Sequence, residues 1–289
     1  GTFQRSVTLL FRYRFQIPYY LGLEDDYDMG VKFDIEATDK LNLTLAYFRQ
    51  PEPAGPGFDA LAGRYSYDIV PGQGAFVDSN GDIVMTDATN QELNQINARL
   101  VWHFDENWHV GLSAQAGGIY NTSLDETDLS TAIAAHLEGN FGRFNLKTEV
   151  IRYDYSAKSN NGDMLDVVQM GGYGYHYGGG DGYTGGVASK ANVYVAGLAY
   201  TFPVNWGPIT SIQTYLDYSM VDKDVEIFHD THFLIPGMLI TAGPLYTYLD
   251  YALGKNQPWL TDSFGKGLGS GVGNQEWNSR FNINLGYYF

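Results

Sequence analysis

The chain has 289 residues, no cysteine and a formal net charge of −16, with 44% hydrophobic and 15% aromatic residues. The acidic balance argues against a nucleic-acid partner, because phosphates require a basic surface. A sequence without cysteine excludes disulfide frameworks and thiolate chemistry. No apolar run reaches the ~18 residues of a membrane-spanning helix. The aromatic content does suit the two interfacial girdles of a membrane β-barrel.

Twelve segments with the character of β-strands follow one another along the chain, separated by turn signals. They are 5–17, 27–38, 40–50, 92–104, 108–121, 129–141, 143–155, 190–202, 209–221, 230–241, 244–254 and 279–289. In the last, Phe281, Ile283 and Leu285 alternate with Asn282 and Asn284. Segments of about 10 residues with this alternation, in even number, are typical of outer-membrane barrels.

The sequence therefore predicts an all-β fold, a transmembrane antiparallel up-and-down β-barrel of about 12 strands that forms one domain over 1–289. Two stacked soluble sheets are the alternative. Short connections alternate with long ones, as expected for short periplasmic turns and long extracellular loops. The short connections are 39–40, 105–107, 142–143, 203–208 and 242–243, and the long ones are 51–91, 157–189 and 255–278.

Two of the long connections bear on the bore of such a barrel. Ordered loops of the length of 51–91 are usually functional, so we expect this one to fold inward and narrow the channel. The Gly- and Tyr-rich stretch 171–186 either offers stacking surfaces to a solute or is a mobile extracellular loop.

Charged residues inside the strands fall mostly on the phase that faces inward. A charge on the lipid face costs roughly 2–4 kcal/mol near the midplane, which explains this bias. Arg152 is the exception, and a bulge or a position near the rim would account for it. The residues expected to line the pore are Arg12, Arg14, Lys32, Asp34, Glu36, Arg99, Glu138, Lys147, Glu149, Tyr215, Asp217, Tyr246, Tyr248 and Asp250.

The distribution of these residues predicts how a pore would select solutes. The cations Arg12, Arg14, Lys32 and Arg99 lie in the first third of the chain, and most of the acids lie later. A transverse field across a hydrated lumen is therefore expected, with tyrosines as stacking surfaces for sugar-like solutes. In the alternative, the inward charges pair with one another in a plugged lumen.

Catalytic and metal sites have weak support in the sequence. Ser113 and His136 fall inward on neighbouring strands, as a nucleophile and its base would. Asp230 and His232 resemble half of a protease site. The stretch 78–82 begins like a calcium loop but lacks the later ligands, which favours a plain turn. We therefore expect no enzymatic activity, no cofactor and no metal.

Three parts of the chain resemble the bacterial porin family that includes phosphate-selective porins. They are 18–30, 63–68, and 254–259 leading to 277–289. The resemblance implies barrels of about sixteen strands that assemble as homotrimers. It also implies phosphate selection by inward arginines and lysines, which the acids of this chain would oppose. The chain is expected to be either a compact twelve-strand relative or to lack the front of the barrel.

Together these features predict a porin of the bacterial outer membrane, a passive diffusion channel for small hydrophilic solutes or ions. Its other expected partners are outer-membrane lipid and lipopolysaccharide. No signal peptide is recognisable, so the chain is expected to be mature or trimmed at its front. Two alternatives remain open. One is a non-conducting barrel that acts as a scaffold or adhesin through its acidic loops, and the other is a lipid-active barrel enzyme.

Overall fold

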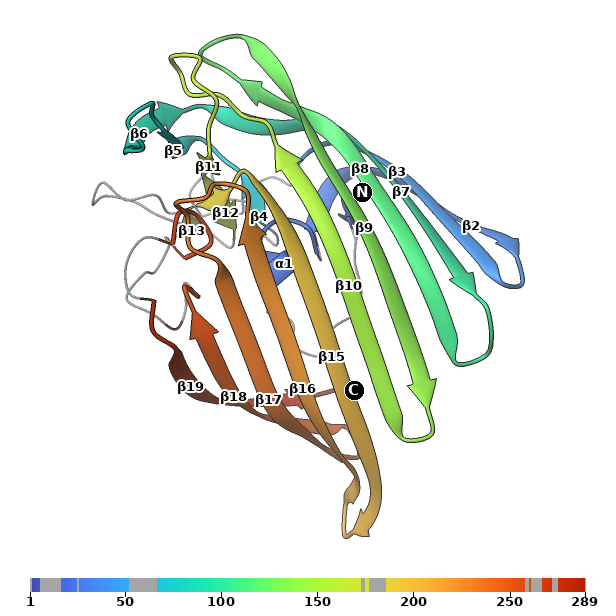
Figure 1. Cartoon of the computed structure of the whole chain (residues 1–289). Helices are drawn as coiled ribbons and strands as arrows, with labels where there is room; N and C mark the ends of the chain where they lie inside the picture. The colour runs from blue at the N-terminus through green and yellow to red at the C-terminus, as the bar shows by residue number, and fades with distance from the viewer. Residues whose placement is uncertain are drawn as a thin grey trace.

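The computed structural model describes residues 2–5, 17–24, 26–51, 67–172, 175–176, 186–257, 260, 267–271 and 275–288. Twelve strands form one antiparallel sheet in the order β1-β2-β3-β7-β8-β9-β10-β15-β16-β17-β18-β19 (Figure 1). The first six are β1 (Thr2–Arg5), β2 (Asp26–Thr38), β3 (Leu41–Pro51), β7 (Asn90–His103), β8 (Trp108–Asn121) and β9 (Glu126–Phe141). The others are β10 (Phe144–Tyr155), β15 (Lys190–Trp206), β16 (Ile209–Lys223), β17 (Thr231–Ala242), β18 (Leu245–Lys255) and β19 (Asn278–Tyr287).

Each of these strands pairs with the next member of the sheet along the chain, so the topology is up-and-down. The predicted all-β antiparallel fold is confirmed, and each of the twelve predicted segments overlaps one strand of the sheet, the first of them only at Arg5. β1 and β19 are the two edge strands among the described residues. Closure into a barrel therefore stays a prediction.

Two predicted boundaries are wrong. The strand expected over 5–17 cannot reach its end, because Ile17 begins the helix α1 (Ile17–Tyr20); residues 6–16 lie outside the described part. Proline at the second position of α1 is tolerated because N–H groups of a first helical turn have no partner in the helix. The connection expected over 203–208 is shorter, since β15 continues past a bulge to Trp206.

Two-residue turns containing glycine join three hairpins of the sheet. Gly142, Gly207 and Gly243 have φ values of 64°, 60° and 58°. A side chain at such a φ is strained, whereas glycine adopts it readily. These turns fix the register of β9 with β10, β15 with β16, and β17 with β18, and all lie at one end of the sheet (Figure 1).

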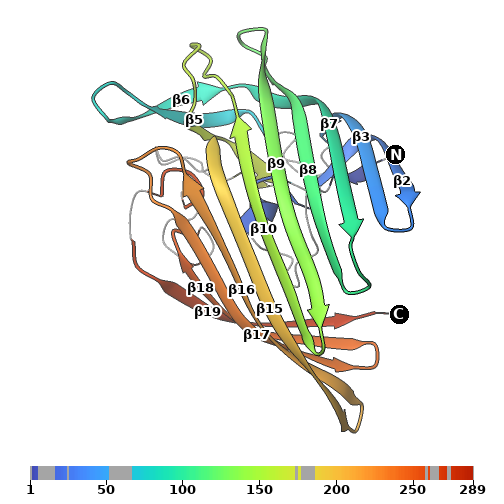
Figure 2. The same ribbon diagram turned by 45° about the vertical axis from the view of Figure 1, so that its right-hand side comes forward.

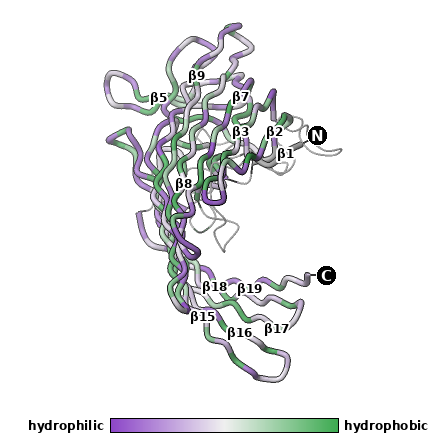
Figure 3. The backbone as a smooth tube through the Cα atoms, turned by 90° about the vertical axis from the view of Figure 1, so that its right-hand side faces the viewer, coloured by the Kyte–Doolittle hydropathy of each residue, from purple (hydrophilic) through white to green (hydrophobic). Residues whose placement is uncertain are grey.

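The sheet curves into a trough whose two edges turn toward the same side (Figure 3). We call its inner surface the concave face and its outer surface the convex face. α1, β4 (Tyr67–Ile69) and β12 (Met170–Gly172) lie on the concave side, near the end with the long connections (Figure 2). β4 and β12 form a three-stranded sheet with β13 (Tyr175–His176). A four-stranded sheet joins β14 (Val187–Ala188), β11 (Val167–Val168), β5 (Gly72–Val77) and β6 (Ile83–Ala88).

The segment carrying α1 is anchored to the concave face by aromatic packing and hydrogen bonds. The rings of Tyr19 and Tyr67 meet edge to face, with centroids 5.3 Å apart. Tyr155 donates a hydrogen bond from its hydroxyl to the Leu21 carbonyl at 2.6 Å. The Ile69 amide donates to Glu92 on β7 at 3.0 Å. These contacts show that chain segments fill this end of the trough.

Part of the loop that was predicted to fold inward lies in this end of the trough. Residues 67–70, from the connection expected over 51–91, are buried there. Residues 52–66 lie outside the described part, so control of the bore by this loop stays a prediction. Most of the Gly- and Tyr-rich stretch 171–186 also lies outside it.

Exposure alternates along the strands between the two faces. On the convex face, Leu112 and Ile133 are 58% and 59% exposed. Their sequence neighbours on the concave face, Ser113 and Ala134, are buried. Arg152 lies on the convex face near the end of β10, where it makes a two-pronged ion pair with Asp224. Both ladders of β10 run through Arg152 without a register shift. Its position near the rim, rather than a bulge, therefore explains why Arg152 faces outward.

Glycine 237 makes room for a buried hydrogen bond on the concave face. Its position in β17 lies between Tyr215 on β16 and Asp250 on β18. The Tyr215 hydroxyl reaches across it to donate to the Asp250 carboxylate. A Cβ atom at position 237 would lie 2.4 Å from Tyr215 Cε2, which no packed structure accepts.

Gly237→Ala is therefore expected to lower the free energy of unfolding by ~1–3 kcal/mol, because the Tyr215 ring must move. Gly286→Ala is the matched control on the edge strand β19, where the new Cβ meets only the exposed Tyr288 ring, at 3.0 Å. Urea titration of both variants, followed by tryptophan fluorescence, gives the comparison. Equal stability of the two variants would contradict this account of Gly237.

Candidate pore-lining surface

A row of ionisable side chains crosses the concave face nearer the short turns. Directly paired residues of an antiparallel ladder point to the same face. His103 pairs with His109, His109 with Glu138 and Glu138 with Lys147. Lys147 pairs with Gly197, and Gly197 pairs with Asp217. The row therefore runs across β7, β8, β9, β10, β15 and β16.

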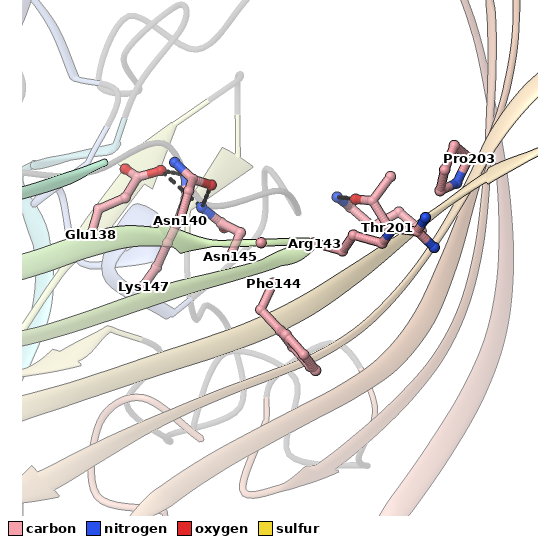
Figure 4. Close-up of a pocket in the computed structure, with 10 residues that line it drawn as sticks. Glu138, Asn140, Arg143, Phe144, Asn145, Lys147, Thr201 and Pro203 are labelled. Atoms are coloured by element: carbon pink, nitrogen blue, oxygen red, sulfur yellow. Dashed lines mark hydrogen bonds and ion pairs between the residues drawn. The ribbon is translucent and has the colours of Figure 1, made fainter. Parts of the chain in front are cut away.

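A hollow of about 540 Å³ lies on the concave face beside this row, at the turn end (Figure 4). Phe144, at its edge, points to the opposite face of the sheet (Figure 4). The lining residues are Glu138, Asn140, Gly142, Arg143, Phe144, Asn145, Lys147, Thr201, Pro203 and Gln213. Because side-chain amides and charges dominate this set, the hollow suits a small polar solute.

Hydrogen bonds and ion pairs hold the polar side chains of the hollow in place. Lys147 Nζ lies 3.2 Å from Glu138 Oε1. Asn145 donates from its amide nitrogen to Asn140 Oδ1 at 2.9 Å, and Gln213 donates to Thr201 Oγ1 at 2.8 Å. The other carboxylate oxygen of Glu138 lies 3.7 Å from His109 Nε2. Glu138 thus links the hollow to the histidines of the row.

Several buried polar atoms on the same face have no hydrogen-bond partner among the residues that the structure describes. They include Ser113 Oγ, Arg99 Nε and both ring nitrogens of His136. An unpartnered polar atom in an apolar environment is costly, and buried groups of this kind are normally satisfied by water. The concave face at this level is therefore suited to contact with water.

Most of the predicted pore-lining residues share this face. Lys32, Asp34, Glu36, Arg99, Glu138, Lys147, Glu149, Tyr215, Asp217, Tyr246, Tyr248 and Asp250 all fall on its side of the ladders. Arg12 and Arg14 lie outside the described residues. Some charges pair, as Lys32 does with Asp34 at 3.3 Å. Their lining of a pore stays a prediction.

His109 is a member of the row that sequence reasoning missed. It lies on the same phase of β8 as Gly111 and Ser113, so the alternation that placed Ser113 inward could have found it. Its proximity to His103, with ring centroids 5.1 Å apart, depends on the pairing of β7 with β8 and is not visible in the sequence.

The weakly supported catalytic pairs are not joined in the structure. Ser113 pairs with Ala134, whereas His136 lies over Gly111, and no hydrogen bond links the Ser113 hydroxyl to the imidazole. His232 lies 2.9 Å from the Tyr218 hydroxyl, while Asp230 accepts the Lys223 amide. The expectation that the chain is not an enzyme stays a prediction.

The calcium-like stretch 78–82 is the turn of a hairpin between β5 and β6. Asp78 Oδ1 accepts the amides of Asp82 at 2.9 Å and Asn80 at 2.8 Å. These hydrogen bonds hold the pKa of the Asp78 carboxyl below its ordinary value. Within the described residues, no group of three or more His, Asp or Glu side chains is arranged to hold a metal ion.

No family model and no curated protein matches the chain. The outer membrane channel DcaP of Acinetobacter baumannii is similar over 93% of this chain and 64% of its own, at 11% identity and a TM-score of 0.49. OprD, an outer membrane protein from Pseudomonas aeruginosa, is similar over 92% and 69%, at 11% identity and a TM-score of 0.42. LpxR from Salmonella typhimurium is similar over 90% and 88%, at 9% identity and a TM-score of 0.31.

The chain spans about 64% of the length of DcaP. Likenesses with TM-scores below 0.5 do not establish what this chain does. The resemblance to the porin family that includes phosphate-selective porins therefore stays a prediction.

Glu138→Gln is expected to lower the free energy of unfolding by ~1–3 kcal/mol, because it removes the counter-charge of a largely buried ammonium. Glu36→Gln, the same change at an exposed position of β2, is the control and should be close to neutral. Urea titration of both variants measures the difference. An equal, small effect of the two would show that Glu138 does not hold this cluster together.

Proposed function

We propose that the chain forms a porin-like channel of a bacterial outer membrane, through which small hydrophilic solutes or ions diffuse passively. The observation that carries the proposal is the chemical difference between the two faces of one sheet. The convex face is apolar over its middle, and the concave face carries the ionisable row.

Aromatic rings mark one border of the apolar zone on the convex face. Trp108 stacks with Phe141 at a centroid distance of 6.0 Å, and Phe141 stacks with Phe144 at 5.1 Å. Phe144 then meets Tyr200 at 4.7 Å, and Tyr200 meets Phe202 at 4.5 Å. This continuous chain of rings follows the turn end of the sheet from β8 to β15. Such a girdle is typical of a membrane interface.

Ion pairs mark the other border. Besides the pair of Arg152 and Asp224, Lys190 Nζ lies 2.9 Å from Asp154 Oδ2 on the convex face. Phe144 and Arg152 are eight residues apart on β10, which corresponds to ~27 Å along a strand. At the tilt of roughly 35–45° usual for such barrels, this length spans ~20 Å of height, which is comparable with the apolar band of outer-membrane barrels, about 25 Å.

A channel also needs a closed wall, and we propose that the sheet forms it by closing at its edges. Every backbone polar group in a bilayer must find a partner, so open sheet edges do not occur there. With twelve strands in the sheet, β1 and β19 run antiparallel and are suited to pairing with each other or with further strands. Assembly as a homotrimer, implied by the family resemblance, belongs to the same proposal.

The inner residues then act on the permeating solute without chemical change. Carboxylates and cations of the concave face set the preference between cations and anions. The segments packed inside the trough, α1 and β4, reduce its width. The bound lipids would be those of the outer membrane, including lipopolysaccharide, along the convex face. No cofactor is required for this role.

The alternatives predict different properties of the same faces. A scaffold or adhesin would have a plugged lumen and would not conduct. A soluble sheet would not need an apolar convex face between rings and ion pairs. Ion pairing inside the trough, as between Lys147 and Glu138, is compatible with a plug. Within the described part of the chain, the polar atoms of Ser113 and His136 have no hydrogen-bond partner, which favours a hydrated lumen.

Leu137→Arg tests the lipid-facing role of the convex face, because Leu137 pairs with Thr148, midway along β10 between Phe144 and Arg152. A charge at the bilayer midplane costs roughly 2–4 kcal/mol, so we expect this loss in unfolding free energy measured in phospholipid vesicles. Asn145→Arg, on the concave face in the hollow, is the control and should cost much less. If the two substitutions are equally tolerated, the convex face does not contact lipid.

The double variant Lys32→Gln with Arg99→Gln tests the role of the inward cations. Discrete current steps of the native chain in a planar bilayer would establish the pore. Removing two cations from its wall should shift the reversal potential under a salt gradient toward cation selectivity. Arg152→Gln, which neutralises a convex-face arginine, should leave it unchanged. A folded protein that never conducts would overturn the channel function.

A further inference from the structure

The polar hollow at the turn end of the concave face is lined by two hydrogen-bonded pairs of side chains. Asn140 and Asn145, from the hairpin of β9 and β10, form one pair. Thr201 on β15 and Gln213 on β16 form the other. Asn140 and Asn145 stand apart from Thr201 across the hollow (Figure 4). Its volume of about 540 Å³ is within the usual range of sites for small molecules.

We infer that this hollow binds neutral saccharides on their way through the channel, an inference that rests on the proposed function. A saccharide carries many hydroxyl groups, each of which both donates and accepts hydrogen bonds, and it carries no charge. A binding site for it therefore needs donors and acceptors together, and its own charges have to be compensated within the protein.

The amide and hydroxyl groups of the hollow offer donors and acceptors at once. Asn140 accepts through Oδ1, and within the described part of the chain no group accepts from its exposed amide nitrogen. Thr201 also accepts through its oxygen, so its hydroxyl proton remains to donate to a solute. Gln213 donates through its amide nitrogen, and its amide oxygen remains to accept.

The charges of the hollow are arranged against ionic solutes. Lys147 is buried and lies 3.2 Å from Glu138. A solute ion that bound one of these groups would draw it away from the other and leave a largely buried charge without its counter-charge, which is costly. Arg143 lies in the exposed turn, where salt screens its charge. A neutral solute forms hydrogen bonds in the hollow without this cost.

The strand next to these groups leaves room for a solute. On the concave face of β15, Gly197 pairs with Lys147 and Ala199 pairs with Asn145. Both are small residues, so no long side chain of β15 covers the polar groups of β10 from that side. The hydrogen-bonding groups of the hollow are therefore accessible from the inside of the trough.

An aromatic side chain lies further along the same face. The pairing of Gln213 with Leu239, and of Leu239 with Tyr248, places the half-buried Tyr248 two strands beyond the hollow. Two strand spacings are ~10 Å. The C–H groups of a sugar ring pack against the electron-rich face of an aromatic ring. A saccharide of two rings is thus suited to contact the hollow and Tyr248 together.

The test is to add lactose, a neutral disaccharide, to native channels in a planar bilayer. A bound sugar obstructs ion flow, so we expect reversible interruptions of the current whose frequency saturates with lactose concentration. Poly(ethylene glycol) of similar size is the control for obstruction without a binding site and should show no saturation. Lactobionate, the anion formed by oxidation of lactose, should bind about threefold or more weakly, because it competes with the ion pair of the hollow.

Gln213→Leu and Asn140→Leu each replace an amide of the hollow with an apolar side chain. Each should weaken lactose binding by about fivefold, the usual effect of losing one hydrogen bond. Asn42→Leu is the matched control, because Asn42 lies on the same face of the sheet at the turn end of β3 and outside the hollow. It should bind lactose as the native channel does. If one of the two variants does not fold, the other decides.

The outcomes separate the saccharide site from the channel. Current steps that lactose interrupts no more than poly(ethylene glycol) does, or two variants that both bind lactose like the control, would overturn the site and leave the channel intact. Stronger binding of lactobionate than of lactose would also overturn it. The absence of current steps from folded protein would overturn the channel. Saturation-transfer NMR of lactose with the same protein in detergent micelles then decides the site: a signal that Gln213→Leu weakens supports it, and no signal overturns it.

Discussion

The two-residue period of a pleated strand is the constraint on which the rest of this molecule depends. Backbone groups pair within the ladder, so side chains alone decide what each face contacts. Because neighbours in sequence point to opposite faces, Leu112 and Ser113 differ in exposure although they are adjacent. Twelve strands that keep this phase give one sheet an apolar convex face and a polar concave face.

The concave face is divided along the strands. Near the long connections it is apolar, where α1 and β4 pack on Tyr153, Val193 and other buried residues. Near the short turns it carries three histidines, the Glu138–Lys147 pair and the polar hollow. This division separates two properties of the proposed channel. Packing at one end limits the width, and charge at the other end selects what passes.

Most of the sheet could be predicted from the sequence, because alternation and turn residues are local signals. Gly142, Gly207 and Gly243 mark hairpins that the structure contains. The start of α1 was missed because its position depends on packing inside the trough, which no local pattern reveals. The face on which Glu92 lies could not be predicted from the local pattern either. A β-bulge between Leu93 and Ile96 changes the alternation of β7 next to Glu92.

The polar residues of the concave face could be predicted from the sequence, but their contacts with one another only in part. Strand phase placed Arg99, Glu138 and Lys147 on one face, as the ladders show. The contact of Lys147 with Glu138 and the approach of His103 to His109 depend on the register between strands. Register follows from turn geometry and from long-range pairing, and a single sequence defines it only where a tight turn joins the strands.

The most direct test is to measure which solvent meets each face. Since the chain has no cysteine, a spin label can be attached to a single introduced cysteine at each position from 145 to 148 of β10 in lipid vesicles. The account predicts alternation, with labels at 146 and 148 accessible to oxygen in the lipid and labels at 145 and 147, beside the hollow, accessible to a water-soluble nickel complex. Water access at every position, or at none, would contradict it.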